Sequence, residues 1–271
     1  MTDRGSVHRP ARRLTVAGGE ILDEIVAEEV AVALVYNGIS HAVMMATPAD
    51  LEDFARGFTL TERIVGKPSE IFDIEVEEGE RGIEVKLEIA APRMQSLQER
   101  RRSLAGRTGC GLCGVDSLEA AMRPVAVSVS GSRVARAAIE RAMTALPARQ
   151  RINKLNGATH AAGWADAEGS LIAVREDVGR HNALDKLAGA LALMDKNAPG
   201  SVAPGGFVVV TSRCSYEMVQ KAAAIGAAAI SAVSAPTSLA IETAERANIA
   251  LAAFVREGRL TAYAHAERIL P

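Results

Sequence analysis

The sequence predicts an α/β protein, α+β overall, in which a small N-terminal unit precedes a larger α/β domain. Two observations support this prediction. Residues 28–92 contain four short segments of strand-like composition and one stretch of helical periodicity. Residues 161–254 instead alternate short apolar strands with polar loops and amphipathic helices. That order is typical of a mainly parallel sheet with helices on its faces.

Composition argues against several classes of function. Of the 271 residues, 48% are hydrophobic and 24% are charged, which is ordinary for a globular protein. The chain has 31 Lys and Arg against 33 Asp and Glu, and only 3% of its residues are aromatic. We therefore expect neither broad nucleic-acid binding nor a base-stacking surface. Three cysteines are too few for a disulfide framework.

Residues 1–13 are polar and Arg-rich without an apolar run, so we expect a disordered tail and not a secretory signal. The longest apolar stretch, Ala222–Ala235, is interrupted by Gly226, Ser231 and Ser234 and is too short to cross a bilayer. We therefore expect a cytoplasmic protein with no membrane partner.

Residues 14–94 form the predicted N-terminal α+β unit. Its hairpin turns at Asn37-Gly38, a strong two-residue turn signal, and its helix opens near Asp50. The expected strands are Val30–Tyr36, Ile39–Met45, Ile71–Glu77 and Gly82–Ile89, and the helix carries Leu51, Phe54, Ala55 and Phe58 at helical spacing. Residues 95–120 are expected to be a linker, because residues 106–114 contain four glycines and suit a flexible loop.

Residues 121–271 form the predicted α/β domain. Strands are expected at 161–164, 171–174, 206–210 and 228–233, with a closing hairpin of 249–254 and 260–265. Helices are expected to begin near Asn182, Ser215 and Thr237, which are good N-cap types. Asp185 stands three residues after Asn182, in a position that resembles a capping box.

The pair Cys110-x-x-Cys113 is the first candidate for chemistry, and several interpretations stay open. The thiols could be buried and inert. Zinc would need two more ligands, and the chain offers only Cys214 and scattered histidines without a second paired spacing. A zinc deaminase places H-x-E before P-C-x-x-C, whereas the only H-x-E here is His265–Glu267. A thioredoxin-like dithiol would follow a strand, which the Gly/Arg-rich run is not.

The remaining interpretation is a mobile nucleophilic thiol. A helix start is predicted just after Cys113, at Asp116–Glu119, and Arg107 lies near in the sequence. The positive end of a helix and a neighbouring guanidinium both favour thiolate over thiol. Such a thiolate can accept sulfane sulfur from one protein and deliver it at another site.

The segment 175–186 is the second candidate, because it joins a strand end to a helix start. Loops at this position line the ligand crevice of open α/β sheets, and Arg180, His181 and Lys186 suit a phosphate-bearing ligand. The alternative is a polar loop with solvated charges. Two similar loops, 211–215 and 234–238, are expected to converge on the same edge, which favours a pocket. Cys214 is expected to be a small buried residue.

These residues together resemble the FdhD family of formate dehydrogenase accessory sulfurtransferases. Blocks in the family's order cover the chain from about residue 20 to its end: Ala55–Glu62, Gly109–Gly114, Asp177–Lys186, Ser212–Lys221 and Phe254–Arg259. One departure is Arg63, where the family often has glycine after Thr-Glu, so the conformation of this turn stays open.

The resemblance implies a cytidine-deaminase-like C-terminal domain without its zinc site, and a homodimer. It also implies a sulfur carrier, with sulfur taken from a cysteine desulfurase as a persulfide on Cys110, assisted by Cys113. The sulfur would pass to bis-molybdopterin guanine dinucleotide before that cofactor enters formate dehydrogenase. The residues expected at the cofactor are Arg180, His181, Ser212, Arg213, Phe254, Val255, Arg256, Glu257, Gly258 and Arg259.

Two other functions stay open at this point. A non-catalytic chaperone would bind and protect the cofactor through the Arg180-His181 loop, and its cysteines would be dispensable. A zinc-dependent deaminase on a similar fold would contain stoichiometric zinc in the purified protein.

Overall fold

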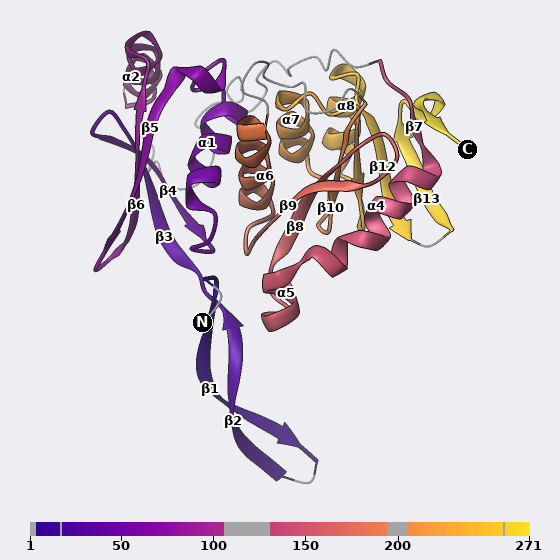
Figure 1. Ribbon diagram of the computed structural model, residues 1–271, viewed down its shortest axis with the longest axis horizontal. Coiled ribbons are helices and arrows are strands. Elements are labelled where there is room, and N and C mark those ends of the chain that lie inside the picture. The colour runs from indigo at the N-terminus through magenta and orange to yellow at the C-terminus, as the bar shows by residue number, and fades with distance from the viewer. Residues whose placement is uncertain (1–3, 17, 106–130, 195–204, 257) are drawn as a thin grey trace.

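The computed structural model describes residues 4–16, 18–105, 131–194, 205–256 and 258–271. Its described part is an α+β arrangement of two main sheets. A four-stranded sheet lies in the N-terminal half and a six-stranded sheet in the C-terminal half. Helices α1 and α6 lie side by side between them (Figure 1).

The N-terminal sheet has the order β4-β3-β6-β5. The hairpin, the helix and the second strand pair are confirmed. Asn37 and Gly38 have φ of 46° and 81°, as a tight hairpin turn requires. Helices α1 and α2 supply Phe54, Phe58 and Leu97 to an apolar cluster with this sheet. The elements are β3 (Val30–Tyr36), β4 (Ile39–Ala46), α1 (Leu51–Thr61), η1 (Pro68–Glu70), β5 (Ile71–Gly79), β6 (Gly82–Ile89) and α2 (Ala91–Ala105).

The C-terminal sheet has the order β13-β12-β11-β10-β8-β9. The predicted strands are present, but the expectation of a mainly parallel sheet is wrong. Only β10–β11 and β11–β12 pair in parallel, while β8 pairs antiparallel with both β9 and β10, and β13 pairs antiparallel with β12. Two hairpins, which need no crossover helix, therefore flank a parallel centre. The strands are β8 (His160–Ala165), β9 (Leu171–Asp177), β10 (Phe207–Val210), β11 (Ala229–Ala232), β12 (Ala250–Arg256) and β13 (Arg259–Ala264).

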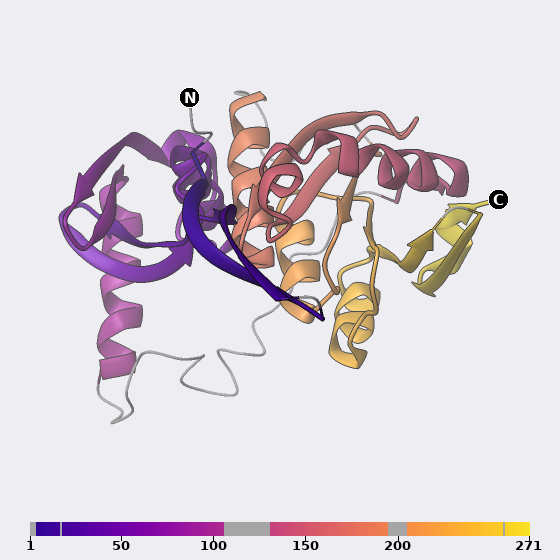
Figure 2. The same cartoon turned by 90° about the horizontal axis from the view of Figure 1, so that it is seen from below.

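Helices cover both faces of this sheet (Figure 2). Alternate residues of β10 point to opposite sides, so Val208 and Val210 pack under α6, α7 and α8, while Phe207 and Val209 pack under α4. The helices α4 and α5 were not anticipated from the sequence. The elements are α4 (Arg136–Arg149), α5 (Arg151–Asn156), α6 (Arg180–Met194), α7 (Tyr216–Ala224), α8 (Ser238–Arg246) and η2 (Ala266–Arg268), with a short pair of β7 (Val134–Ala135) and β14 (Ile269–Leu270).

Two expectations about polar segments are corrected. Residues 6–13 are not a disordered tail: they belong to β1 (Ser6–Thr15), which pairs antiparallel with β2 (Gly18–Ala27) along its whole length. The linker expected at 95–120 begins too early, because α2 continues to Ala105. Both segments are polar, so apolar periodicity gave no signal, and backbone pairing stabilises them instead.

The two halves are joined where α1 crosses α6. A Cβ atom on Gly57 would overlap the backbone of Asp185, and one on Gly189 would overlap the backbone of Asp53. Both glycines are therefore needed for close helix contact. At the end of α1, Arg63 has φ of 54°, the conformation that glycine adopts most readily. Ile64 N donates to Thr59 O at 2.9 Å, so the helix-ending turn forms with arginine in this place.

No helix among the described residues is long and apolar enough to cross a membrane.

Candidate functional site at the sheet edge

Four strands of the six-stranded sheet end at the same edge. Strands β10, β11 and β12 are parallel to one another, and β9 runs in their direction because both β9 and β10 are antiparallel to β8. Helices α6, α7 and α8 are the next elements after β9, β10 and β11, respectively. Helix N-termini carry partial positive charge and free N–H groups, so this edge favours an anionic ligand.

Side-chain and backbone contacts connect the loops along the edge. His181 Nε2 lies 3.0 Å from Glu217 Oε2 and 3.4 Å from Ser215 Oγ, which joins the start of α6 to the start of α7. Cys214 and Pro236 form a backbone bridge, with Cys214 N donating to Ala235 O at 3.1 Å. The predicted convergence of the three loops is therefore present.

Arg180 is the cation best placed to bind a ligand. Its Nε is buried, with no hydrogen-bond partner among the described residues. A buried, charged donor without an acceptor is costly, and a bound anion would satisfy it.

Two neighbours of Arg180 were not singled out from the sequence. Burial and then the Arg180 charge lower the pKa of His160, at the start of β8. A hydrogen bond from His181 lowers the pKa of Glu217, and Arg180 contributes to this. Glu217 belongs to the Ser212–Lys221 block and His160 to none, and no signal in the sequence indicated that the fold would bring both near Arg180.

The loop after β10 contains two buried residues, Ser212 and Cys214, on either side of an exposed one, Arg213. Ser212 is buried and donates its hydroxyl to Arg213 O at 2.9 Å, while the Arg213 side chain is exposed. Cys214 is fully buried, and burial raises the pKa of its thiol to about 12. The expectation of a small buried residue at Cys214 is confirmed, and a protonated thiol of this kind is a poor nucleophile.

The described residues of the segment 254–259, at the end of β12 and the start of β13, lie at the far end of the edge. Phe254 is 37% exposed and has φ of 53°, within an irregular part of the β12–β13 pairing. Positive φ at a bulky residue is an outlier of the kind that gathers at functional sites. Phe254 N donates to Ser234 O at 3.5 Å, while Val255 is buried and Arg256, Gly258 and Arg259 are exposed. Glu257 lies outside the described residues.

Other polar residues of the segment 177–186 are used inside the protein. Asp177 and Lys186 form a fully buried ion pair at 2.6 Å. Asp177 also accepts from Thr47 N at 3.0 Å, and Lys186 donates to Thr47 O at 2.8 Å. The predicted capping box is wrong, because α6 begins at Arg180 and the Asn182 side chain donates to Met45 O at 2.8 Å. Lys186 is therefore not a candidate for ligand binding.

A second buried cluster joins three segments that are distant in the sequence. Lys221 Nζ lies 2.9 Å from both Asp185 Oδ1 and Glu62 Oε1. Thr61 donates its hydroxyl to Asp185 Oδ1 at 2.6 Å. Burial raises the pKa of Asp185, and Lys221 opposes that shift. This cluster fixes α6 and α7 against α1, and with the Asp177–Lys186 pair it holds the Arg180-His181 loop in place.

Cys110 and Cys113 lie outside the described residues, so their roles remain predictions. Among the residues that are described, no group of three or more His, Cys, Asp or Glu side chains is arranged to hold a metal ion.

Comparison with known proteins identifies the family of this chain. The model of the FdhD/NarQ family matches residues 27–270. The chain belongs to the FdhD/NarQ family. It is 58% identical over 254 residues to the sulfur carrier protein FdhD of Cupriavidus necator, covering 93% of this chain and 86% of that one. It is 50% identical over 255 residues to the sulfur carrier protein FdhD of Bordetella petrii, covering 94% of this chain and 90% of that one.

The fold also has a solved counterpart. A formate dehydrogenase accessory protein from Desulfotalea psychrophila superposes with a TM-score of 0.74 at 25% identity, covering 98% of this chain and all of that one. In this FdhD/NarQ member, the described parts of the motif blocks divide into two groups. Asp177, Asp185, Lys186 and Lys221 join the two halves. Arg180 and His181 stand at the start of α6, and Arg213 stands in the loop before α7, at the sheet edge.

Proposed function

We propose that this chain is a sulfur carrier that serves formate dehydrogenase. It accepts sulfur from a cysteine desulfurase as a persulfide on Cys110 and delivers it to bis-molybdopterin guanine dinucleotide. The client cofactor binds at the sheet edge formed by the starts of α6, α7 and α8. On this proposal the protein is cytoplasmic and acts as a homodimer.

The observation that supports this proposal most is the composition of the sheet edge at the starts of α6, α7 and α8. The similarity of the chain to proteins named sulfur carriers supports it further. Three helix N-termini, the unsatisfied Nε of Arg180 and the exposed Arg213 and Arg256 suit the phosphates of a dinucleotide. Phe254 offers an exposed aromatic ring beside them, which suits a planar base.

The sulfur chemistry needs no metal. The Cys110 thiolate attacks the outer sulfur of the donor's persulfide, the donor's S–S bond breaks, and the donor leaves as a thiolate. In the second step, the Cys113 thiolate attacks the inner sulfur of the Cys110 persulfide. This closes a Cys110–Cys113 disulfide and releases hydrosulfide to the acceptor, and a thiol reductant then restores both cysteines.

Intact mass spectrometry tests the loading step. The full-length protein is incubated with a cysteine desulfurase and cysteine, beside Cys110→Ala and Cys113→Ala. We expect wild type and Cys113→Ala to gain the mass of one sulfur atom and Cys110→Ala to gain none. Cys214→Ala is the matched control and should load as wild type does, because the Cys214 thiol is buried and protonated.

The same experiment separates the proposal from its main alternative. If no sample gains sulfur while the protein still binds a guanine nucleotide, the chain is a cofactor-binding chaperone. Stoichiometric zinc in the purified protein would instead favour a deaminase.

A further inference from the structure

The four-stranded sheet β4-β3-β6-β5 has one covered face and one uncovered face. Helices α1 and α2 pack Phe54, Phe58 and Leu97 against its inner face. No helix among the described residues covers the opposite face, called the outer face here (Figure 1). Side chains alternate between the two faces along each strand, so the register of the four strands assigns residues to the outer face. It has an apolar half on β3 and β4 and a charged half on β5 and β6.

The apolar half of the outer face consists of Ala31 and Ala33 of β3 with Val43 and Met45 of β4. In the antiparallel ladder, Val43 lies opposite Ala33, and Met45 lies opposite Ala31. The Val43 side chain is 61% exposed and the Met45 side chain is 51% exposed. Covering neighbouring aliphatic side chains that are this exposed is favourable, so the apolar half suits contact with a second surface.

The charged half consists of Asp73, Glu75 and Glu77 of β5 with Glu84, Lys86 and Glu88 of β6. Glu77 lies directly opposite Glu84. Asp73 lies directly opposite Glu88. Like charges directly opposite each other destabilise a sheet, so the stability of the fold does not account for these two pairs. Lys86 is the single cation among the six residues, and its hydrogen bond to Glu77, followed by the nearby carboxylate charges, raises its pKa.

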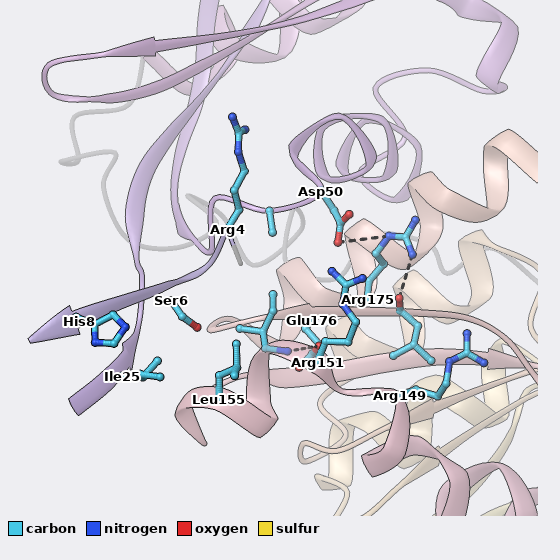
Figure 3. A pocket seen from close by; sticks show the side chains of 13 residues that line it. Arg4, Ser6, His8, Ile25, Asp50, Arg149, Arg151, Leu155, Arg175 and Glu176 are labelled. Atoms are coloured by element: carbon cyan, nitrogen blue, oxygen red, sulfur yellow. Dashed lines mark hydrogen bonds and ion pairs between the residues drawn. The ribbon is translucent and has the colours of Figure 1, made fainter. Parts of the chain in front are cut away.

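The groove in Figure 3 shows the opposite balance of charge. It lies between the β1–β2 hairpin, the start of α1, the helix α5 and the strand β9. Asp50 Oδ2 in this groove lies 3.7 Å from Arg175 Nε, and Glu176 Oε2 accepts from Ile152 N at 2.9 Å. The arginines that line it are Arg4, Arg149, Arg151 and Arg175. The excess of negative charge is therefore a local property of the outer face, in a chain whose formal net charge is only −2.

We propose that the outer face is the docking surface for the sulfur donor, the cysteine desulfurase, through a donor surface that carries Lys and Arg side chains around an aliphatic or aromatic anchor. The anchor covers Val43 and Met45, and the cations meet the carboxylates of the charged half. The inference rests on the proposed function for the identity of the partner.

The position of the outer face favours the donor of sulfur over its recipient. Helices α1 and α6 lie between this sheet and the six-stranded sheet, whose edge is the candidate cofactor site (Figure 1). A protein that receives the cofactor must contact that edge. A donor must instead reach Cys110, which follows the end of α2, in the same half of the chain as the outer face, by five residues. A donor on the outer face therefore leaves the cofactor edge free.

The size of the outer face predicts weak and reversible docking. Its strands are seven to nine residues long and, at a spacing of about 4.8 Å, give a face of roughly 500 Å². A standard stable interface covers about 800 Å² on each partner. Opposite charges on two such surfaces act mainly by speeding association, and added salt screens them.

A double charge reversal separates docking from folding. Glu84→Lys sets a cation opposite Glu77, and Glu88→Lys does the same opposite Asp73. Because both changes replace a like-charge pair by an opposite-charge pair, the variant that carries both should melt at or above the temperature of wild type. Its docking should nevertheless weaken.

Surface plasmon resonance on immobilised cysteine desulfurase measures the docking of each full-length protein. We expect the association rate constant of wild type to fall as sodium chloride is added, and that of the double variant to be about tenfold lower at low salt. The matched control, Glu242→Lys with Glu245→Lys, makes the same change of charge at exposed positions of α8. It should associate as wild type does.

Val43→Thr tests the apolar half. Threonine has the shape of valine and suits a strand, but a hydroxyl group replaces one methyl group. Covering that hydroxyl without a partner is unfavourable, so the dissociation constant should rise about threefold to tenfold, at high salt as well as at low salt.

Three results would overturn the inference. They are a wild type that does not bind the desulfurase, a double variant that associates as fast as wild type, and an equal loss in the double variant and its control. If the proteins bind as expected but none gains sulfur, the proposed function fails while the docking surface stands.

Discussion

Arg180 is the residue on which the candidate site depends most. Its Nε is buried without an acceptor among the described residues. Its positive charge also contributes to the lowered pKa of both His160 and Glu217. Nearby polar residues of the same segment, Asp177, Asn182 and Lys186, are held by partners inside the protein. Residues available to a ligand and residues with partners inside the protein alternate within ten positions. A sequence motif alone therefore does not distinguish the two.

Replacing Arg180 should weaken binding of the guanine end of the cofactor. Hydrogen bonds to a charged group contribute about 1.5–3 kcal/mol, so Arg180→Ala should raise the dissociation constant for guanosine diphosphate roughly tenfold to a hundredfold. Isothermal titration calorimetry measures this, with Arg246→Ala, at an exposed arginine in the last turn of α8, as the matched control. Equal affinity in wild type and Arg180→Ala would remove Arg180 from the site.

At the scale of elements, the α1–α6 contact decides how the two halves sit. Glycine in an exposed helix is less stable than alanine by about 1 kcal/mol, so a Gly→Ala change there normally stabilises. At Gly57 the added methyl group would meet the backbone of α6. We therefore expect Gly57→Ala to destabilise the protein.

Gly57→Ala should lower the free energy of unfolding by about 1–3 kcal/mol, the usual cost of overpacking. Urea denaturation followed by circular dichroism measures this change. In the matched control, Gly79→Ala, the added Cβ makes only an ordinary contact at 3.5 Å, and the change should stay within about 0.5 kcal/mol. A Gly57→Ala variant as stable as wild type would show that the helices can move apart at little cost.

At the scale of the whole molecule, local turns and the convergence of loops within one sheet could be predicted from the sequence, whereas side-chain contacts between the two halves could not. The Asn37-Gly38 turn and the alternation around it identify a hairpin locally, and Ser215 and Thr237 stand directly before their helices. In the Lys221–Asp185–Glu62 cluster, Glu62 is more than 120 positions from both of its partners, a contact that no local pattern reveals.

The two largest errors of the sequence-based prediction, the expected tail and the expected ligand-binding role of Lys186, have the same physical origin. The hairpin of β1 and β2 is held mainly by backbone pairing, so the polar residues 6–13 resemble a tail in the sequence. Helix α6 is buried from Asn182 to Leu191 because α1 covers the face that would otherwise meet solvent. Its charged residues resemble a ligand loop until their partners in the other half of the chain are known.

Sulfur handover is the central claim, and a single-turnover maturation assay tests it most directly. The protein is loaded with persulfide, freed of the desulfurase and cysteine, and mixed with molybdenum cofactor and inactive formate dehydrogenase. We predict that loaded wild type restores formate oxidation in proportion to the sulfur it carries, while unloaded wild type and Cys110→Ala restore none. Equal activation by loaded and unloaded protein would contradict sulfur transfer and leave a chaperone that only binds the cofactor.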